Sequence, residues 1–243
     1  MNDLLPPWIA LDLFWEQVAI EGISALDENR GNDAAHLWHT AELLCASFDA
    51  HDPRRAATMT NQGAALEQQG RTEEAETRYR EALVLWDGVS GWIERMTVEL
   101  QAKSAHFHRR LEVRHGPELK KLRRHIQGRL NQGGAAATST NLARLLTARG
   151  KIAEAEEISA PAVEARGSGI GHRDSGLAKA CDARAACLEA LDRNGEAVEL
   201  REKAAAIRED PSSPGPVRLA KEGGGKMTDE RRLMAAAYFA VTL

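Results

Sequence analysis

Apolar residues recur along most of this chain with the spacing of amphipathic α-helices. The clearest case is TNQGAALEQQGRTEEAETRYREALVLWD, residues 60–87, in which small residues fall at regular places among larger apolar ones. Ala75, Tyr79 and Ala82 are separated by four and three positions, so they share one face of a helix. The segment therefore predicts two helices, over residues 57–69 and from residue 72 onward.

Both predicted helices have recognisable ends. Gly70 ends the first, because glycine readily takes the left-handed conformation found after a helix C-terminus. Thr72 is expected to cap the second helix, and the glutamates that follow it favour the positive end of the helix dipole. The small residues Gly63 and Ala75 predict that the two helices cross closely.

The same pattern recurs three more times. The equivalents of Ala75 along the chain are Ala34, Ala155 and Ala197. Successive members of this series lie 41, 80 and 42 residues apart, so the long interval has room for one degenerate unit, over residues 97–137. Gly116 and Pro117 interrupt the expected second helix of that unit, which predicts a kink or an altered curvature there.

These residues resemble the tetratricopeptide repeat (TPR), and the spacing near 41 is similar to the longer repeats of the kinesin light chain group. The resemblance covers about residues 15–209. It implies an all-α fold, a right-handed superhelical solenoid of antiparallel helix pairs with about five repeats. The expected repeat domain is residues 1–210, and its N-terminal capping helix starts at Pro7.

The last part of the chain has a different composition. Residues 211–226 are rich in Pro, Gly and Ser, which is typical of a flexible linker. Residues 227–243 predict an amphipathic helix, whose apolar stripe must be buried for a helix of this length to be stable. It either caps the last repeat or docks in a groove, its own or that of a second copy. We favour groove docking, which makes self-association a further expectation.

Composition and charge place the protein among ordinary globular chains, with 43% hydrophobic and 28% charged residues. A net charge of -4 gives no general affinity for polyanions. The three cysteines form no CxxC motif, so we expect buried free thiols in a reducing compartment. The N-terminus lacks the basic residues of a signal peptide, and no apolar run is long enough for a membrane span. The expected location is cytoplasmic, without membrane contact.

No motif predicts catalysis. His36 and His39 share a helical face with Cys45 further along, but no HExxH motif occurs and no third metal ligand falls at a reliable spacing. GSGIGH, residues 167–172, lacks the strand and the Lys-Ser/Thr pair of a phosphate loop, so it is interpreted as a loop between repeats. The sequence therefore predicts no enzyme, no metal site and no cofactor.

The resemblance implies that the first helix of each pair lines a concave groove that binds a peptide or partner protein. The inward positions are Thr60, Asn61, Glu67, Gln101, His108, Arg109, Asn141, Arg144, Lys179 and Asp182. Asn61 and Asn141 occupy equivalent positions, and a carboxamide can donate to and accept from the main chain of an extended peptide. The alternative is that each asparagine bonds a neighbouring helix. We favour peptide binding, because the inward position repeats.

Residues 103–129 hold nine Lys or Arg against two Glu and coincide with the degenerate unit. Its basic patch comprises Arg110, Lys120, Lys121, Arg123 and Arg124. The run is either a solvated helix face or a docking site for an acidic protein segment or nucleic acid. Only Phe107 is available for base stacking, so an acidic protein surface is favoured over nucleic acid.

The sequence thus predicts a non-catalytic scaffold, an adaptor or assembly chaperone, that binds a partner in its groove. The alternative is a regulator that binds nucleic acid or acidic ligands through the basic third repeat.

Overall fold

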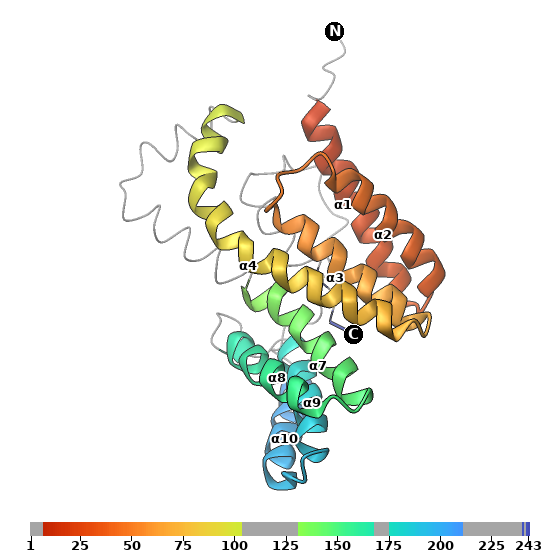
Figure 1. Cartoon of the computed structure of the whole chain (residues 1–243), viewed down its shortest axis with the longest axis vertical. Coiled ribbons are helices and arrows are strands. Elements are labelled where there is room, and N and C mark those ends of the chain that lie inside the picture. The colour runs from red at the N-terminus through yellow and green to blue at the C-terminus, as the bar shows by residue number, and fades with distance from the viewer. Residues whose placement is uncertain (1–6, 104–130, 168–174, 211–239, 241) are drawn as a thin grey trace.

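The computed structural model describes residues 7–103, 131–167, 175–210, 240 and 242–243. This part of the chain contains α-helices and one short π-helix, and no strand (Figure 1). The elements are α1 (Pro7–Asp27), α2 (Gly31–Cys45), α3 (Pro53–Gln68), α4 (Thr72–Lys103), the π-helix η1 (Asn131–Ala135), α7 (Ala136–Ala148), α8 (Ile152–Gly167), α9 (Ser175–Glu189) and α10 (Asn194–Glu209).

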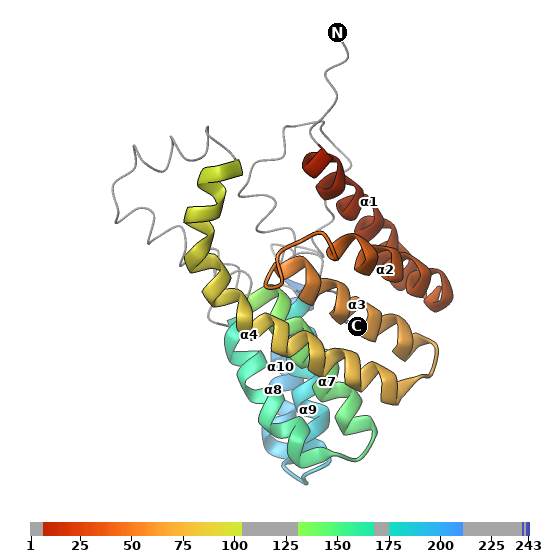
Figure 2. The same cartoon turned by 45° about the horizontal axis from the view of Figure 1, so that its top comes forward.

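The helices form four successive pairs: α1 with α2, α3 with α4, α7 with α8, and α9 with α10. Each pair packs on the next, and the first helices of neighbouring pairs also touch, α1 with α3 and α7 with α9. Figures 1 and 2 show the resulting stack, which runs in order from the N-terminal pair to α10. This arrangement confirms the predicted all-α, TPR-like solenoid of helix pairs.

One turn geometry joins the two helices of every pair. A residue with positive φ follows each first helix: Asn29 at 55°, Gly70 at 76°, Gly150 at 75° and Asp192 at 60°. The N–H of the next residue then donates to the carbonyl oxygen five residues back, as Arg71 does to Leu66 at 2.9 Å and Lys151 to Leu146 at 2.9 Å. This is the Schellman arrangement, which satisfies carbonyl groups at the helix end.

The turn corrects one expectation about α4. The helix begins at Thr72, and the carbonyl oxygen of Arg71 accepts the N–H of Ala75 at 3.0 Å. Arg71 is therefore the capping residue and Thr72 the first helical one. The reason is that the Schellman turn ends on Arg71 and leaves its carbonyl aligned with the helix axis.

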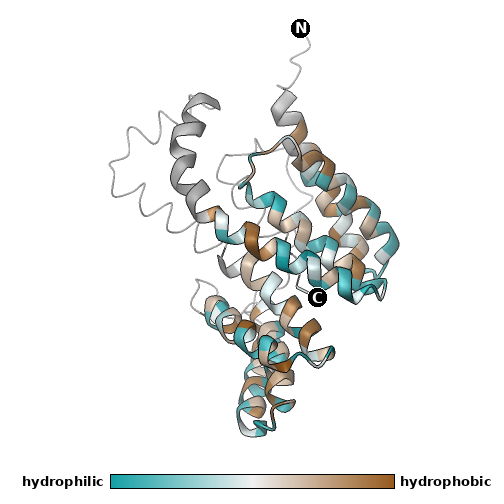
Figure 3. Cartoon of the chain, in the orientation of Figure 1, coloured by the Kyte–Doolittle hydropathy of each residue, from teal (hydrophilic) through white to brown (hydrophobic). Residues whose placement is uncertain are grey.

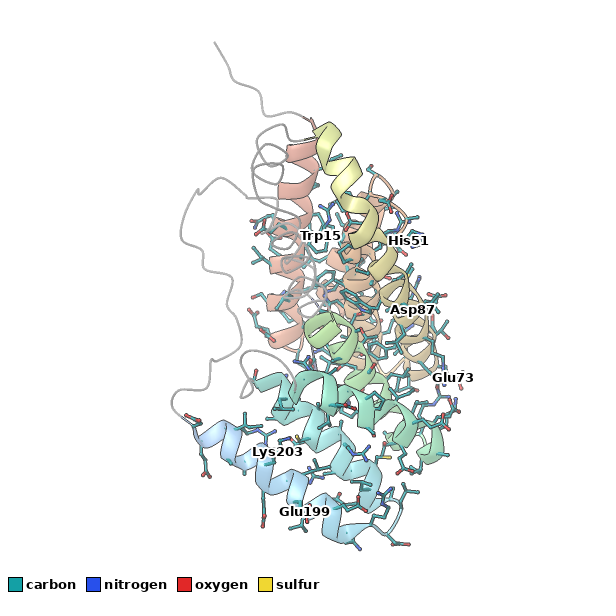
Figure 4. The ribbon with its side chains drawn as sticks, turned by 90° about the vertical axis from the view of Figure 1, so that its left-hand side faces the viewer. Trp15, His51, Glu73, Asp87, Glu199 and Lys203 are labelled. Carbon is teal, nitrogen blue, oxygen red and sulfur yellow. The ribbon has the colours of Figure 1, made fainter. Side chains whose placement is uncertain are left out.

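Close helix crossings occur where the sequence predicts them. A Cβ atom on Gly63 would lie 2.6 Å from Tyr79 Cε1, and one on Gly22 would lie 2.7 Å from Trp38 Cε2. Tyr79 and Trp38 are both 0% exposed, so these glycines make room for the largest side chains of the core. Brown and teal residues interleave along the helices, as amphipathic packing requires (Figure 3). Trp15 faces the core from α1 (Figure 4).

The second pair of the stack contacts the pair after the long interval directly. Thr60 of α3 and Thr138 of α7 share a hydrogen bond of 2.7 Å between their hydroxyl groups. The indole N–H of Trp86, on α4, donates to the same Thr138 hydroxyl at 3.0 Å. Among the described residues, no further helix pair therefore separates these two. The first residues of the degenerate unit expected over residues 97–137 continue α4 to Lys103, and residues 104–130 lie outside the described part of the chain.

Candidate functional site

The first helices touch in succession: α1 contacts α3, Thr60 of α3 bonds Thr138 of α7, and α7 contacts α9. We call the row that they form the inner face. Three expected groove residues from α3 and α7 are completely buried there: Thr60, Asn61 and Asn141. Thr60 donates to the carbonyl oxygen of Ala56 and bonds Thr138, so it serves the contact between α3 and α7. It does not present its hydroxyl to a partner.

Asn141 contacts both the core and another part of the main chain. Its carboxamide oxygen accepts the backbone N–H of Leu243 at 2.9 Å. The same side chain is hydrogen-bonded to Tyr79. Asn141 thus bonds a side chain of the neighbouring helix α4 and the main chain of Leu243 in the same protein.

Two cations hold the residue before Leu243. The Lys179 ammonium, on α9, donates to the carbonyl oxygen of Thr242 at 2.5 Å. Arg166, at the end of α8, donates from Nη2 to the Thr242 hydroxyl at 2.9 Å. Ala240 and Thr242 are each 8% exposed, and Leu243 packs against the apolar cluster of α1, α2 and α3. We call residues Ala240, Thr242 and Leu243 the tail segment; Figures 1 and 2 mark this end of the chain beside α3 and α7.

Lys179, which holds the tail segment, lies among other positively charged side chains. Burial lowers the pKa of Lys179, and the nearby guanidinium groups of Arg166, Arg144 and Arg208 lower it further, while Asp27 opposes them. A folded-state pKa below the ordinary value means that the charged ammonium destabilises the fold. Charged groups that lower the stability of the folded state in this way are common at binding sites.

Arg144, like Lys179, is a basic residue that the sequence predicts on the inner face. Its Nη1 lies 2.7 Å from a Glu67 oxygen, and the Tyr79 hydroxyl donates to the other Glu67 oxygen at 3.1 Å. Burial, followed by the Glu67 charge, raises the pKa of Tyr79 well above its ordinary value, so the phenol stays a neutral donor. Nε and Nη2 of Arg144 are buried and have no hydrogen-bond partner in the described structure.

The remaining expected site residues do not join this cluster. Asp182 pairs with Arg201 at 3.4 Å and with Arg208, so its carboxylate is engaged with α10. Gln101 lies in α4, but its side chain is not described. The other expected residues fall outside the described part of the chain: His108, Arg109, and the basic patch of Arg110, Lys120, Lys121, Arg123 and Arg124.

The inward positions of the repeat do not include Arg166, because they belong to first helices and Arg166 lies on the second helix α8. The Arg166 side chain crosses from α8 over α9 at Gly176, where an added Cβ would lie 1.8 Å from its Nη1. Gly176 follows Ser175 in the first turn of α9, where no turn requires glycine. A glycine inside a helix, where no turn needs it, is a sequence signal for the close approach of another side chain.

Other candidate chemistry is confined to the core. The three cysteines are free and buried, as predicted. Burial raises the pKa of the Cys45 thiol to about 11, although a hydrogen bond with Thr58 acts in the opposite direction. Among the described residues no group of three His, Cys, Asp or Glu side chains could hold a metal ion. None of the described helices combines the length and apolarity that a bilayer crossing needs.

No family model matches the sequence, and neither does any curated protein. Solved structures that align with it include BtubC (BKLC) from P. vanneervenii, at 18% identity over 89% of each chain with a TM-score of 0.39. A Podosopora anserina protein with nearly identical TPR-like repeats of kinesin light chain type aligns at 16% identity, over 79% of this chain and 93% of that one, with a TM-score of 0.31. Its Q17M variant aligns with a TM-score of 0.32. At these low values the similarities carry no argument about ligands.

Proposed function

We propose that this protein is a non-catalytic interaction scaffold that binds an extended segment of a partner protein on its inner face. The observation that carries the proposal is the way the main chain of the tail segment is held. Asn141 accepts an N–H at 2.9 Å, and Lys179 donates to the preceding carbonyl oxygen at 2.5 Å. Every peptide presents these two groups in sequence, so the same side chains can hold a segment of another protein.

The charge of the inner face favours an acidic residue in the partner segment. Arg144 has buried donors without a partner in the described structure, and both Arg144 and Arg166 lie close enough to Lys179 to lower the pKa of its ammonium. A carboxylate among these groups would accept the open hydrogen bonds and relieve the repulsion between the cations. Within this function, an adaptor or assembly chaperone in the cytoplasm is consistent with three thiols that stay reduced.

The experiment is selection of peptides from a random display library on the full-length protein. We expect enriched peptides that share acidic residues. They should bind Lys179→Met more weakly, by about tenfold, which corresponds to the loss of ~1.4 kcal/mol. The matched control is Val84→Ser on α4, at a side chain that is 74% exposed and takes part in none of the inner-face contacts described above. No enrichment, or equal binding to Lys179→Met and the wild type, would rule out the inner face as a peptide site.

A further inference from the structure

We propose that the tail segment is the protein's own ligand for the inner face, and that a partner peptide must displace it. This inference rests on the proposed function and names its regulation. The chain supplies an occupant that already uses the groups assigned to a partner, namely Asn141, Lys179 and Arg166.

The contacts of the tail segment come from separate parts of the stack. Arg166 and Lys179 belong to α8 and α9, Asn141 belongs to α7, and the apolar cluster that receives Leu243 is formed by α1, α2 and α3. The segment is therefore in contact with the first two pairs and the last two at once. An extended partner peptide would have to follow the same line, so both cannot be bound together.

The same contacts define the class of competing peptide. The Thr242 hydroxyl accepts from Arg166, and Leu243 packs against apolar side chains. A competitor should therefore contain a hydroxyl residue followed by an aliphatic one. Serine or threonine before leucine satisfies both conditions, and acidic residues on either side would extend the contact toward Arg144.

Covalent attachment sets how strongly the tail segment competes. A tethered ligand typically acts at an effective concentration on the order of millimolar. The apparent affinity for a free peptide falls by the fraction of molecules whose site is open. Weakening the tail contact by one hydrogen bond should therefore tighten the binding of an added peptide.

The test uses full-length protein and a fluorescent, C-terminally amidated peptide AAAYFAVTL, which copies residues 235–243. Leu243→Pro in the protein removes the N–H that bonds Asn141, and Thr242→Val removes the hydroxyl that bonds Arg166 at nearly constant shape. We expect each variant to bind the peptide about threefold to tenfold more tightly than the wild type. Glu199→Gln, an exposed position on α10, is the control and should bind like the wild type.

Three results would overturn the proposal. Equal affinity of the wild type and both tail variants means that the tail segment does not occupy the site, while peptide binding itself still supports the proposed function. Failure of every form to bind this peptide, or any peptide enriched by selection, removes the proposed function as well. A wild-type dimer in sedimentation velocity that Leu243→Pro converts to a monomer would show that a second copy supplies the segment. Thermal unfolding of each variant confirms that all are folded.

Discussion

Lys151 donates to both carboxylate oxygens of Glu76, at 2.8 and 3.0 Å, although 75 residues separate the two in sequence. Arg193 and Glu156 form the equivalent ion pair between the next two helix pairs. In both cases a basic residue directly after a turn contacts a glutamate of the preceding pair. The contact between α3–α4 and α7–α8 thus has the same geometry as that between α7–α8 and α9–α10, which makes them direct neighbours in the stack.

The first prediction concerns residues 104–130. Because the flanking pairs contact each other directly, replacing this segment with a Gly/Ser linker of equal length should leave the stack intact. We expect a change in unfolding free energy below about 1 kcal/mol, equivalent to about 2–4 °C in Tm for a chain of this size. Circular dichroism melting measures it. A broad or much lower transition would show that the segment stabilises the stack as a repeat.

The same replacement removes the basic patch. If that patch is a docking site for acidic protein segments or RNA, salt-sensitive binding of acidic peptides and RNA should disappear while selected inner-face peptides still bind. If the replaced protein still binds acidic peptides and RNA as the wild type does, at low and at high salt, the basic patch is a solvated surface and no docking site.

The second prediction concerns the Glu76 carboxyl. Burial alone would raise its pKa, but hydrogen bonds from Lys151 and Arg80 outweigh burial, and the pKa lies below its ordinary value of 4.5. A depressed pKa means that the contribution to stability is present above pH 4.5 and is lost as the pH falls through the folded-state pKa. Glu76→Gln should lower the unfolding free energy at pH 7 by about 1.5–3 kcal/mol.

The acid-induced loss of Tm should also be smaller in Glu76→Gln than in the wild type, as scans between neutral and acidic pH would measure. Glu74→Gln is the control, because Glu74 is exposed and its ion pair among the described residues is with the nearby Arg71. It should change Tm far less. Equal effects of the two substitutions would mean that the Glu76–Lys151 ion pair contributes no more to stability than the exposed Glu74–Arg71 pair.

The third prediction concerns the crossing at Gly63. Tyr79 fills the space where a Cβ would lie and is anchored through its hydroxyl to Glu67 at 3.1 Å. Gly63→Ala should therefore destabilise the protein by about 1–3 kcal/mol, the usual range for overpacking. Gly195→Ala is the matched control, because nothing lies within 4 Å of an added Cβ there. It should be neutral or stabilising by up to about 1 kcal/mol. Chemical denaturation curves distinguish the two outcomes.

The fourth prediction separates binding from stability at Lys179. Burial and nearby arginines lower the pKa of its ammonium, so its charge opposes folding at neutral pH. Lys179→Met should leave Tm unchanged or raise it, while it weakens binding of selected peptides. A lower Tm together with unchanged peptide affinity would make Lys179 a structural residue. Comparison with Glu76→Gln is direct, because the two substitutions have opposite expected effects on Tm.

Much of the candidate site could be located from sequence, but not how it is used. Inward positions of the repeat predict Asn141, Arg144 and Lys179 as site residues. Asn141 and Lys179 bond the tail segment, and Arg144 lies close enough to Lys179 to lower its pKa. Thr60 occupies an equivalent position but is buried between helices, because the hydroxyl of Thr138 on α7 lies opposite. The position of a residue in the repeat determines the direction of its side chain. It does not determine which other residues lie opposite that side chain.

The sequence by itself determined the helices, their turns and their small-residue crossings. These features depend on residues a few positions apart: Gly70 and Gly150 adopt positive φ, and the bonds that close each turn span five residues. Only the tertiary structure decided which pairs are neighbours and what occupies the inner face. The contacts Lys151–Glu76 and Leu243–Asn141 join residues 75 and 102 positions apart. Local periodicity cannot encode such contacts, because they depend on the path of the whole chain and on which surfaces gain most from mutual burial.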